Sequence, residues 1–374
     1  MTLHPRLAAA AFVVAACAAQ AQPALPSSWV AGLEAELAQI DAQSRARIGV
    51  YVRDLDTGAT ASLRAGQRWY IASMVKVPVA IAVLRGIERG QFSLDTAVTL
   101  RAADIVDGAG PTSGYPVGTS LTIRFLLEQM IVLSDNAATD VLLDLVGAAE
   151  VNGLVESLVP RGFWRITSLA ESRRLIYGYL TPNAERLRGQ DLLLLHRERS
   201  DVERLQLLAR LVDTPVARYR LSSLDAAYDA YYASGLNSAR LDAYGELLVQ
   251  LADGRALSPR YTAWLLDLME RVATGPHRLK AGLPDGTRFA HKTGTQRRRA
   301  CDAGLVRHVL AGVERRVVIV ACTRDERVLE RSEAALMQVG AAVCRSGALT
   351  EGSTDAVTCR TAPTAERLPA AAER

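Results

Sequence analysis

The stretch "YIASMVKVPVAIAVL", residues 70–84, is an apolar run that carries a single cation, Lys76. Ser73 precedes this lysine by three residues, and valines flank the lysine on both sides. Burying an ammonium group is costly unless the group is paired or loses its proton. The stretch therefore has two interpretations: a lysine whose stem packs while its head reaches water, or a lysine kept away from water for chemistry.

The hydrophobic pattern changes twice along the chain on either side of this stretch. Residues 47–58 and 59–67 alternate around Asp-Thr-Gly and predict a hairpin. Helical spacing then dominates from residue 74 to about 284, and strand character returns over residues 287–295, 302–310 and 315–323, before a final helix over 327–344. This order predicts an α/β (α+β) fold, with an antiparallel sheet formed from both chain ends, flanked by helices, and a large all-helical subdomain inserted.

The composition is that of a soluble protein with enough apolar material for a large core. The chain has 374 residues, of which 49% are hydrophobic and 22% are charged, and its net charge is +4. The arginines are scattered without a basic face, so we expect no nucleic-acid partner. The spacing of the cysteines and histidines matches no zinc site, so we expect no metal and no cofactor. We expect a monomer.

The N-terminus has the pattern of an export signal. Arg6 is followed by an apolar stretch from Leu7 to Ala16 and by small residues that end at Ala21. A stretch of about ten apolar residues is too short for a membrane anchor, which needs roughly twenty. We therefore predict a signal peptide over residues 1–21 and a periplasmic or secreted protein. The sequence "VAAC" leaves an alternative open, in which Cys17 is lipidated and the protein associates with a membrane.

Four cysteines follow the signal, an even number that permits two disulfides in an oxidising compartment. If Ala311-Gly312 is the turn between the last two strands, Cys301 and Cys322 lie directly opposite each other, within reach of a disulfide. Cys344 would then pair with Cys359. A longer loop would shift the register and separate the first pair, and two free buried thiols are the alternative.

Three short motifs occur in order along the chain, each at a definite place in the predicted structure. They are Ser73-Met74-Val75-Lys76 at a helix start, Ser134-Asp135-Asn136 between two helices, and Lys292-Thr293-Gly294-Thr295 on a late strand. Each is weak alone, since a Ser-x-x-Lys arises by chance and Ser-Asp-Asn can simply cap a helix. Together they are the signature of class A β-lactamases and penicillin-binding proteins. Over roughly residues 28–345, the sequence resembles a class A β-lactamase-type serine hydrolase.

The resemblance implies a role for each motif residue in acyl transfer. Ser73 would be the nucleophile, and Lys76, poorly solvated and low in pKa, would accept or relay its proton. Ser134 would pass a proton to the leaving nitrogen. Asn136 would orient Lys76 and the substrate amide. Backbone N–H groups of Ser73 and Thr295 would form the oxyanion hole.

The third motif would bind the substrate carboxylate. Lys292 would supply positive charge near Ser134, and Thr293 and Thr295 would hydrogen-bond the carboxylate. Gly294 would let the strand backbone approach closely.

The sequence departs from the family in the loop that should carry the deacylation base. Class A enzymes have a Glu-x-x-Leu-Asn motif there, but the matching alignment puts Arg173 at the glutamate position and Tyr177 at the asparagine position. Glu171 is the nearby acid, two positions early. It would be a displaced base, or else a carboxylate that lies on the surface or pins the loop.

The chain divides into a catalytic domain over residues 28–345 and a flexible C-terminal tail over 346–374. Within the domain we predict a sheet lobe, 28–90 and 285–345, and a helical lobe, 91–284. An insertion of about residues 181–234 lengthens the helical lobe. It is either scaffold or a surface for a partner, or it reshapes the mouth of the active site.

Three functions remain open. The first is hydrolysis of β-lactams through a Ser73 acyl-enzyme. The second is acyl transfer from a peptidoglycan peptide, as in a DD-peptidase, or from another amide or ester. The third is a penicillin-binding or sensing module that stays acylated. The absence of an evident base favours the second and third, since a general base contributes roughly 10²- to 10⁴-fold in rate. The overall match favours the first.

Overall fold

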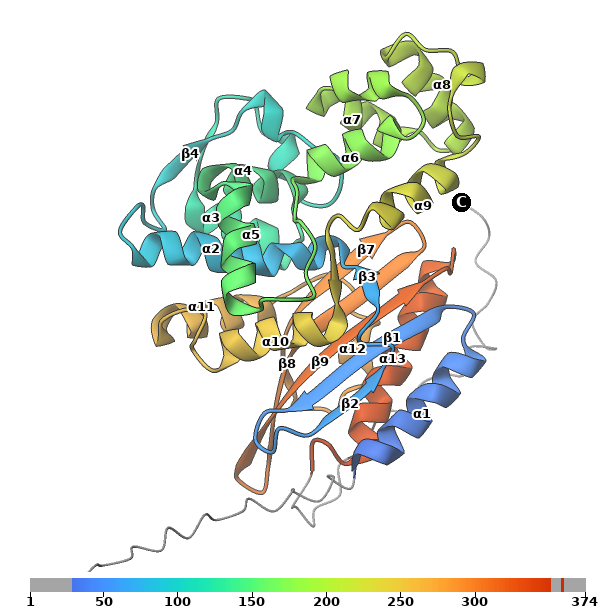
Figure 1. The fold of residues 1–374 in the computed structure, drawn as a ribbon. Helices are drawn as coiled ribbons and strands as arrows, with labels where there is room; N and C mark the ends of the chain where they lie inside the picture. The colour runs from blue at the N-terminus through green and yellow to red at the C-terminus, as the bar shows by residue number, and fades with distance from the viewer. Residues whose placement is uncertain (1–28, 351–357, 360–374) are drawn as a thin grey trace, which may run out of the picture.

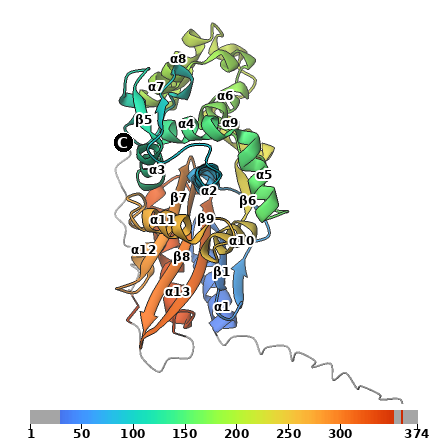
Figure 2. The same ribbon diagram turned by 90° about the vertical axis from the view of Figure 1, so that its left-hand side faces the viewer.

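The computed structural model describes residues 29–350 and 358–359 (Figure 1). The predicted signal peptide, Cys17 and most of the predicted tail lie outside the described residues. Figures 1 and 2 show a sheet with helices at its faces, and a group of helices beyond one end of the sheet. We call these two parts the sheet lobe and the helical lobe.

The sheet lobe is built from both ends of the chain, as the sequence predicted. Its five strands run in the order β2-β1-β9-β8-β7, and each neighbouring pair is antiparallel. The strands are β1 (Arg47–Asp54), β2 (Thr60–Leu63), β7 (Arg288–Gln296), β8 (Arg299–Leu310) and β9 (Val313–Arg324). The predicted hairpin over residues 47–67 is confirmed as β1 and β2.

Two apolar layers enclose this sheet. Helices α1 (Trp29–Gln43), α12 (Leu279–Gly282) and α13 (Leu329–Ser346) form one layer. The buried side chains of α1 recur at helical spacing and pack with β1, β9 and α13. On the other face α10 (Leu241–Ala252) lies against β1, β8 and β9. The sheet is therefore buried on both faces, which makes its strands continuously apolar.

The helical lobe surrounds α2 (Lys76–Glu88), the helix of the opening stretch. Nearly every residue of α2 is buried, and it packs against α3, α4 and α5. The other helices are α3 (Ile123–Val132), α4 (Asn136–Val146), α5 (Ala148–Leu158), α6 (Leu169–Gly178), α7 (Gly189–Arg197), α8 (Asp201–Leu211), α9 (Leu224–Ser234) and α11 (Pro259–Glu270).

Short elements connect these helices. The 3₁₀ turns are η1 (Ala72–Val75), η2 (Ala102–Asp104), η3 (Thr112–Gly114), η4 (Pro182–Arg186) and η5 (Val216–Arg218). Two small antiparallel pairs are β3 (Arg68–Tyr70) with β6 (Ser238–Arg240), and β4 (Ala97–Thr99) with β5 (Ser120–Thr122).

Both predicted disulfides are present. Leu310 opposes Val313 across the turn, so Cys301 and Cys322 oppose each other in β8 and β9 with their Cα atoms 4.0 Å apart. The second disulfide joins Cys344, near the end of α13, to Cys359. The predicted register and both pairings are confirmed.

Candidate active site

Ser73 lies in η1, the turn that leads from β3 into α2, and it is only partly buried. The residue before it, Ala72, has a left-handed backbone with φ of 46°, which is strained for a residue with a Cβ atom. The surrounding core holds this turn in place, and Tyr244 Oη donates a hydrogen bond to the Met74 carbonyl at 2.9 Å. The strained turn presents the Ser73 hydroxyl at the start of the α2 helix.

Lys76 is the first residue of α2 and has no exposed surface. Its Nζ atom lies 3.1 Å from Ser73 Oγ and 2.6 Å from the Ser134 carbonyl oxygen. It also lies 3.1 Å from Ser134 Oγ and 2.7 Å from Asn136 Oδ1. Burial, and after it the Lys292 ammonium, hold the pKa of Lys76 well below its usual value. The amine therefore does not snorkel to water and is suited to accept a proton from Ser73.

The loop between α3 and α4 brings Ser134 and Asn136 to this amine. Ser134 has a left-handed backbone, with φ of 60°. Asp135 caps α4, where its carboxylate accepts the Ala138 N–H at 2.9 Å. Asn136 Nδ2 donates to the Asp107 carbonyl at 2.7 Å, which fixes the amide so that its oxygen faces Lys76.

Lys292 approaches Ser134 from the opposite side, on strand β7. Its Nζ atom donates to Ser134 Oγ at 2.9 Å and to the Thr293 carbonyl at 3.0 Å, and the residue has no exposed surface. Burial, and after it the nearby Arg278 guanidinium, lower the pKa of Lys292 to about 7. Ser134 Oγ thus lies between two amines that burial biases towards the neutral state.

The rest of the third motif adjoins the Ser73 turn. A Cβ atom added at Gly294 would lie 2.5 Å from the Ile71 carbonyl oxygen, so the close passage of β7 over η1 requires glycine. Thr293 is buried and its hydroxyl shares a hydrogen bond with that of Thr274, whereas Thr295 is exposed at the strand end.

The sequence analysis did not find Arg278, which holds the third motif in place through hydrogen bonds. Its Nη1 donates to the carbonyls of Gly294 (3.0 Å) and Cys301 (2.9 Å), and its Nη2 donates to Thr295 Oγ1 at 2.7 Å. Glu333, on α13, pairs with its Nε atom at 3.1 Å. A lone arginine in the loop before α12 belongs to no motif, so only tertiary proximity could reveal it.

Helix α6 places Arg173, and not a carboxylate, towards the catalytic side. Arg173 Nε lies 2.8 Å and 2.9 Å from the two carboxylate oxygens of Asp107, whose carbonyl holds Asn136. Burial would lower the pKa of Arg173, but Asp107 raises it above its usual value. Asp107 was also not predicted, and it belongs to none of the three motifs.

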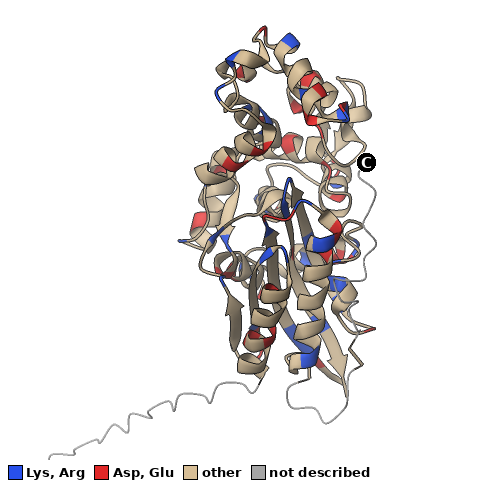
Figure 3. Cartoon of the chain, turned by 90° about the vertical axis from the view of Figure 1, so that its right-hand side faces the viewer, with Lys and Arg blue, Asp and Glu red and all other residues tan. Residues whose placement is uncertain are grey.

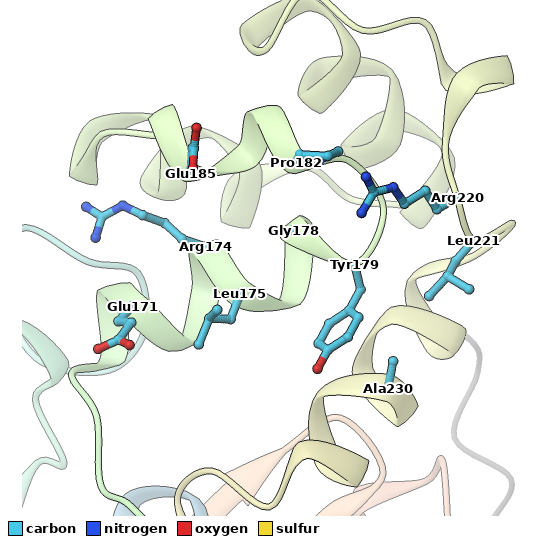
Figure 4. Close-up of a pocket in the computed structure, with 10 residues that line it drawn as sticks. All are labelled: Glu171, Arg174, Leu175, Gly178, Tyr179, Pro182, Glu185, Arg220, Leu221 and Ala230. Atoms are coloured by element: carbon cyan, nitrogen blue, oxygen red, sulfur yellow. The ribbon is translucent and has the colours of Figure 1, made fainter.

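Glu171 lies on the other face of α6. Two residues correspond to about 200° of helix rotation, so Glu171 and Arg173 point in nearly opposite directions. The Glu171 side chain is 43% exposed and pairs with Arg165 at 3.7 Å. It lines a hollow of about 740 Å³ on the outer side of α6, together with Arg174 and Leu175 (Figure 4). The structure does not bring Glu171 together with the other predicted site residues.

Asp140 is another acid that acts on the charge of Lys76. Burial raises its pKa to about 6. Its two carboxylate oxygens accept the backbone N–H groups of Leu169 (2.7 Å) and Ala170 (2.8 Å), so Asp140 caps the start of α6. Tyr177, at the position where the family has asparagine, is buried in the core.

The insertion is attached to the turn that follows Thr295. Arg297, in the turn between β7 and β8, pairs with Asp201 of α8 (Nη1–Oδ1 3.0 Å) and with Asp225 of α9. Tyr232 Oη of α9 donates to the Arg297 carbonyl at 2.7 Å. The insertion therefore contacts the end of the strand that carries the third motif.

Known proteins are similar to this chain in sequence and in fold. The profile of the β-lactamase enzyme family matches residues 32–346. A β-lactamase of Streptomyces albus G is 29% identical over 281 residues, covering 72% of this chain and 71% of that protein. A variant of the class A β-lactamase of the last common ancestor of Gram-negative bacteria is 25% identical, with a TM-score of 0.62 over 84% of this chain and 98% of that one.

A PBP-A variant solved as an acyl-enzyme complex with penicillin-G is 22% identical, with a TM-score of 0.63 over 85% of this chain and 97% of that chain. This likeness shows the fold alone. With the family profile matching most of its length, the chain belongs to the β-lactamase enzyme family, and it is a serine hydrolase of that family.

Proposed function

We propose that this protein opens β-lactams through a covalent acyl-enzyme at Ser73. The observation that carries the proposal is the 3.1 Å contact between Ser73 Oγ and the buried amine of Lys76. That geometry is the arrangement of a nucleophile with its general base. The names of the relatives, which are β-lactamases, support the choice of substrate.

The proton moves in a closed sequence. Lys76 takes the proton of Ser73 as Oγ attacks the lactam carbonyl, and the N–H groups of Ser73 and Thr295 stabilise the oxyanion. Ser134 then gives its proton to the lactam nitrogen as the carbon–nitrogen bond breaks, and Lys76 returns a proton to Ser134 across their 3.1 Å contact. Lys292 and Thr295 bind the substrate carboxylate.

A second candidate function, a penicillin-binding protein that stays acylated, is favoured by the Arg173–Asp107 pair. Water attack on the acyl-enzyme needs a positioned base. Arg173 occupies the position where the family carries its glutamate, and its Nε atom lies 2.8 Å from Asp107 Oδ1. Glu171 lies on the opposite face of α6. A peptidoglycan peptide is the alternative acyl donor in either case, because the motifs define acyl transfer and not the donor.

We also propose that the protein is exported. Its N-terminal sequence supports this, and two disulfides are typical of an oxidising compartment. Among the described residues, no helix has the length and apolar character needed to cross a bilayer.

Intact mass after mixing with penicillin G, followed over time, tests the proposal. We expect a mass increase equal to one penicillin on the native protein and none on Ser73→Ala. Decay of the adduct with release of penicilloate supports hydrolysis, and a lasting adduct supports the penicillin-binding function. Neither an adduct nor penicilloate from the native protein would indicate a different acyl donor, and an equal adduct on Ser73→Ala would contradict Ser73 as the nucleophile.

A further inference from the structure

A second hollow, of about 310 Å³, lies beside strands β3 and β6 and is rich in arginine. Arg68, Arg299 and Arg324 line it, with Asp229 as its one acid. None of the residues assigned above to acyl transfer lines this hollow. In Figure 3 the Lys and Arg segments are spread over both lobes, and some of them lie where the sheet lobe meets the helical lobe. We call this hollow the arginine pocket.

The sheet register forces like charges together at this place. Arg299 of β8 opposes Arg324 of β9, and Arg324 in turn opposes Arg47 of β1. Like charges directly opposite each other destabilise a sheet. The disulfide between Cys301 and Cys322, two residues along each strand, fixes this register. The fold therefore holds three guanidinium groups side by side at one end of the sheet.

Aromatic rings hold the pocket arginines in place. The guanidinium carbons lie 4.4 Å (Arg299 over Tyr232), 4.5 Å (Arg324 over Trp69) and 5.5 Å (Arg68 over Trp164) from the ring centres. Stacking fixes the plane of a guanidinium. Each of the three also donates a hydrogen bond to a protein oxygen at its edge, Arg68 to Ala233 (3.0 Å), Arg299 to Arg298 (2.9 Å) and Arg324 to Gln67 (2.9 Å). Because a guanidinium has five N–H donors, others remain for an oxyanion in the same plane. The pocket thus has preoriented donors.

The nearby acids do not balance these charges. Asp229 pairs with Arg298 at 3.2 Å. Asp325 lies outside the pocket lining and is shared among Arg298 (3.7 Å), Arg299 (3.2 Å) and Arg324 (3.8 Å). Among the residues that line the pocket, three are arginines (Arg68, Arg299 and Arg324) and one is an acid (Asp229), which leaves two positive charges in excess. Burial lowers the pKa of Arg324, and the arginines that face it on either side lower it further.

We propose that the arginine pocket binds a phosphate-type dianion, either inorganic phosphate or a small phosphate monoester. A dianion matches the two excess charges, whereas a monocarboxylate would neutralise only one of them. Arginine forks bind phosphate oxygens in pairs, which suits donors fixed by stacking. The proposal does not rest on the acyl-enzyme chemistry, since no residue is shared between the two sites.

Titration of the full-length protein with inorganic phosphate, and separately with glycerol 3-phosphate, tests the proposal. Sodium chloride at matched ionic strength is the reference. Tryptophan fluorescence reports locally, because Trp69 stacks on Arg324, and thermal unfolding reports globally. Arg324→Gln and Arg299→Gln remove one donor group each. Arg260→Gln is the matched control, since Arg260 stacks on Tyr261 at 5.4 Å but lies outside the pocket.

We expect saturable binding by the native protein and by Arg260→Gln, and an affinity at least about tenfold lower in Arg324→Gln and Arg299→Gln. In chloride alone, Arg324→Gln should unfold at a higher temperature than the native protein, because it removes like-charge repulsion. Tighter binding of the ester than of phosphate would identify the monoester as the ligand, and the reverse would identify the free ion. If chloride stabilises the protein as much as both probes do, or if Arg324→Gln binds as the control does, the pocket is not an anion site.

Discussion

Lys292 is the group that we expect to limit acylation above neutral pH. Its charged form is needed to bind the substrate carboxylate, and burial together with Arg278 lowers its pKa to about 7. With that pKa, roughly one tenth of the lysine is charged at pH 8 and about one hundredth at pH 9. The second-order rate constant for acylation should therefore fall about tenfold per pH unit above pH 7. Below this range it should rise with pH as Lys76 loses its proton.

Stopped-flow acylation with a chromogenic cephalosporin between pH 5 and pH 10 measures this profile. The low-substrate rate reports the free enzyme, in which no carboxylate raises the pKa of Lys292. Lys292→Arg keeps its charge throughout and should lose the alkaline fall, while Lys292→Gln should be slow with no alkaline fall. A native rate that stays level to pH 9, or an alkaline fall that persists in Lys292→Arg, would refute the reasoning.

Three further predictions concern neighbouring groups. Lys76→Ala should slow acylation roughly 10²- to 10⁴-fold, and Lys76→Arg should not restore it because arginine keeps its proton; a near-native rate for Lys76→Arg in stopped flow would assign the lysine an electrostatic role. The double variant Asp107→Asn with Arg173→Glu should lose its acyl group faster than the native protein, as measured by intact mass. Glu171→Gln should deacylate at the native rate, and slower deacylation of Glu171→Gln would instead make Glu171 the base. Arg297→Gln should slow acylation about tenfold because it loosens the turn after β7. The measurement is the acylation rate as a function of substrate concentration, and an unchanged rate would mean that the insertion serves only as scaffold.

The order of helices and strands was predictable because the spacing of apolar residues is a local property of the chain. The alternation over residues 47–67 and 302–323, with helical spacing between them, indicated a sheet closed by both chain ends. The Cys301–Cys322 disulfide could be predicted from the position of the turn at Ala311-Gly312, because in antiparallel strands one register sets every opposed pair. The motif residues were likewise readable, because their chemistry depends on fixed local spacing at a helix start, a loop and a strand.

Only the tertiary structure decided which other side chains meet these motifs. Arg278, Asp107 and Arg173 lie outside the three motifs, and packing places them beside the motif residues, which no local pattern records. The face of α6 on which Glu171 lies depends on how the helix is rotated against its neighbours. The shift of two residues from Arg173 therefore rotates the side chain by about 200°, slightly more than half a turn. Sequence alone determined the elements and the motif residues, with Ser73 as the expected nucleophile, because both follow from local spacing. The partners of that nucleophile were decided by contacts between distant parts of the chain.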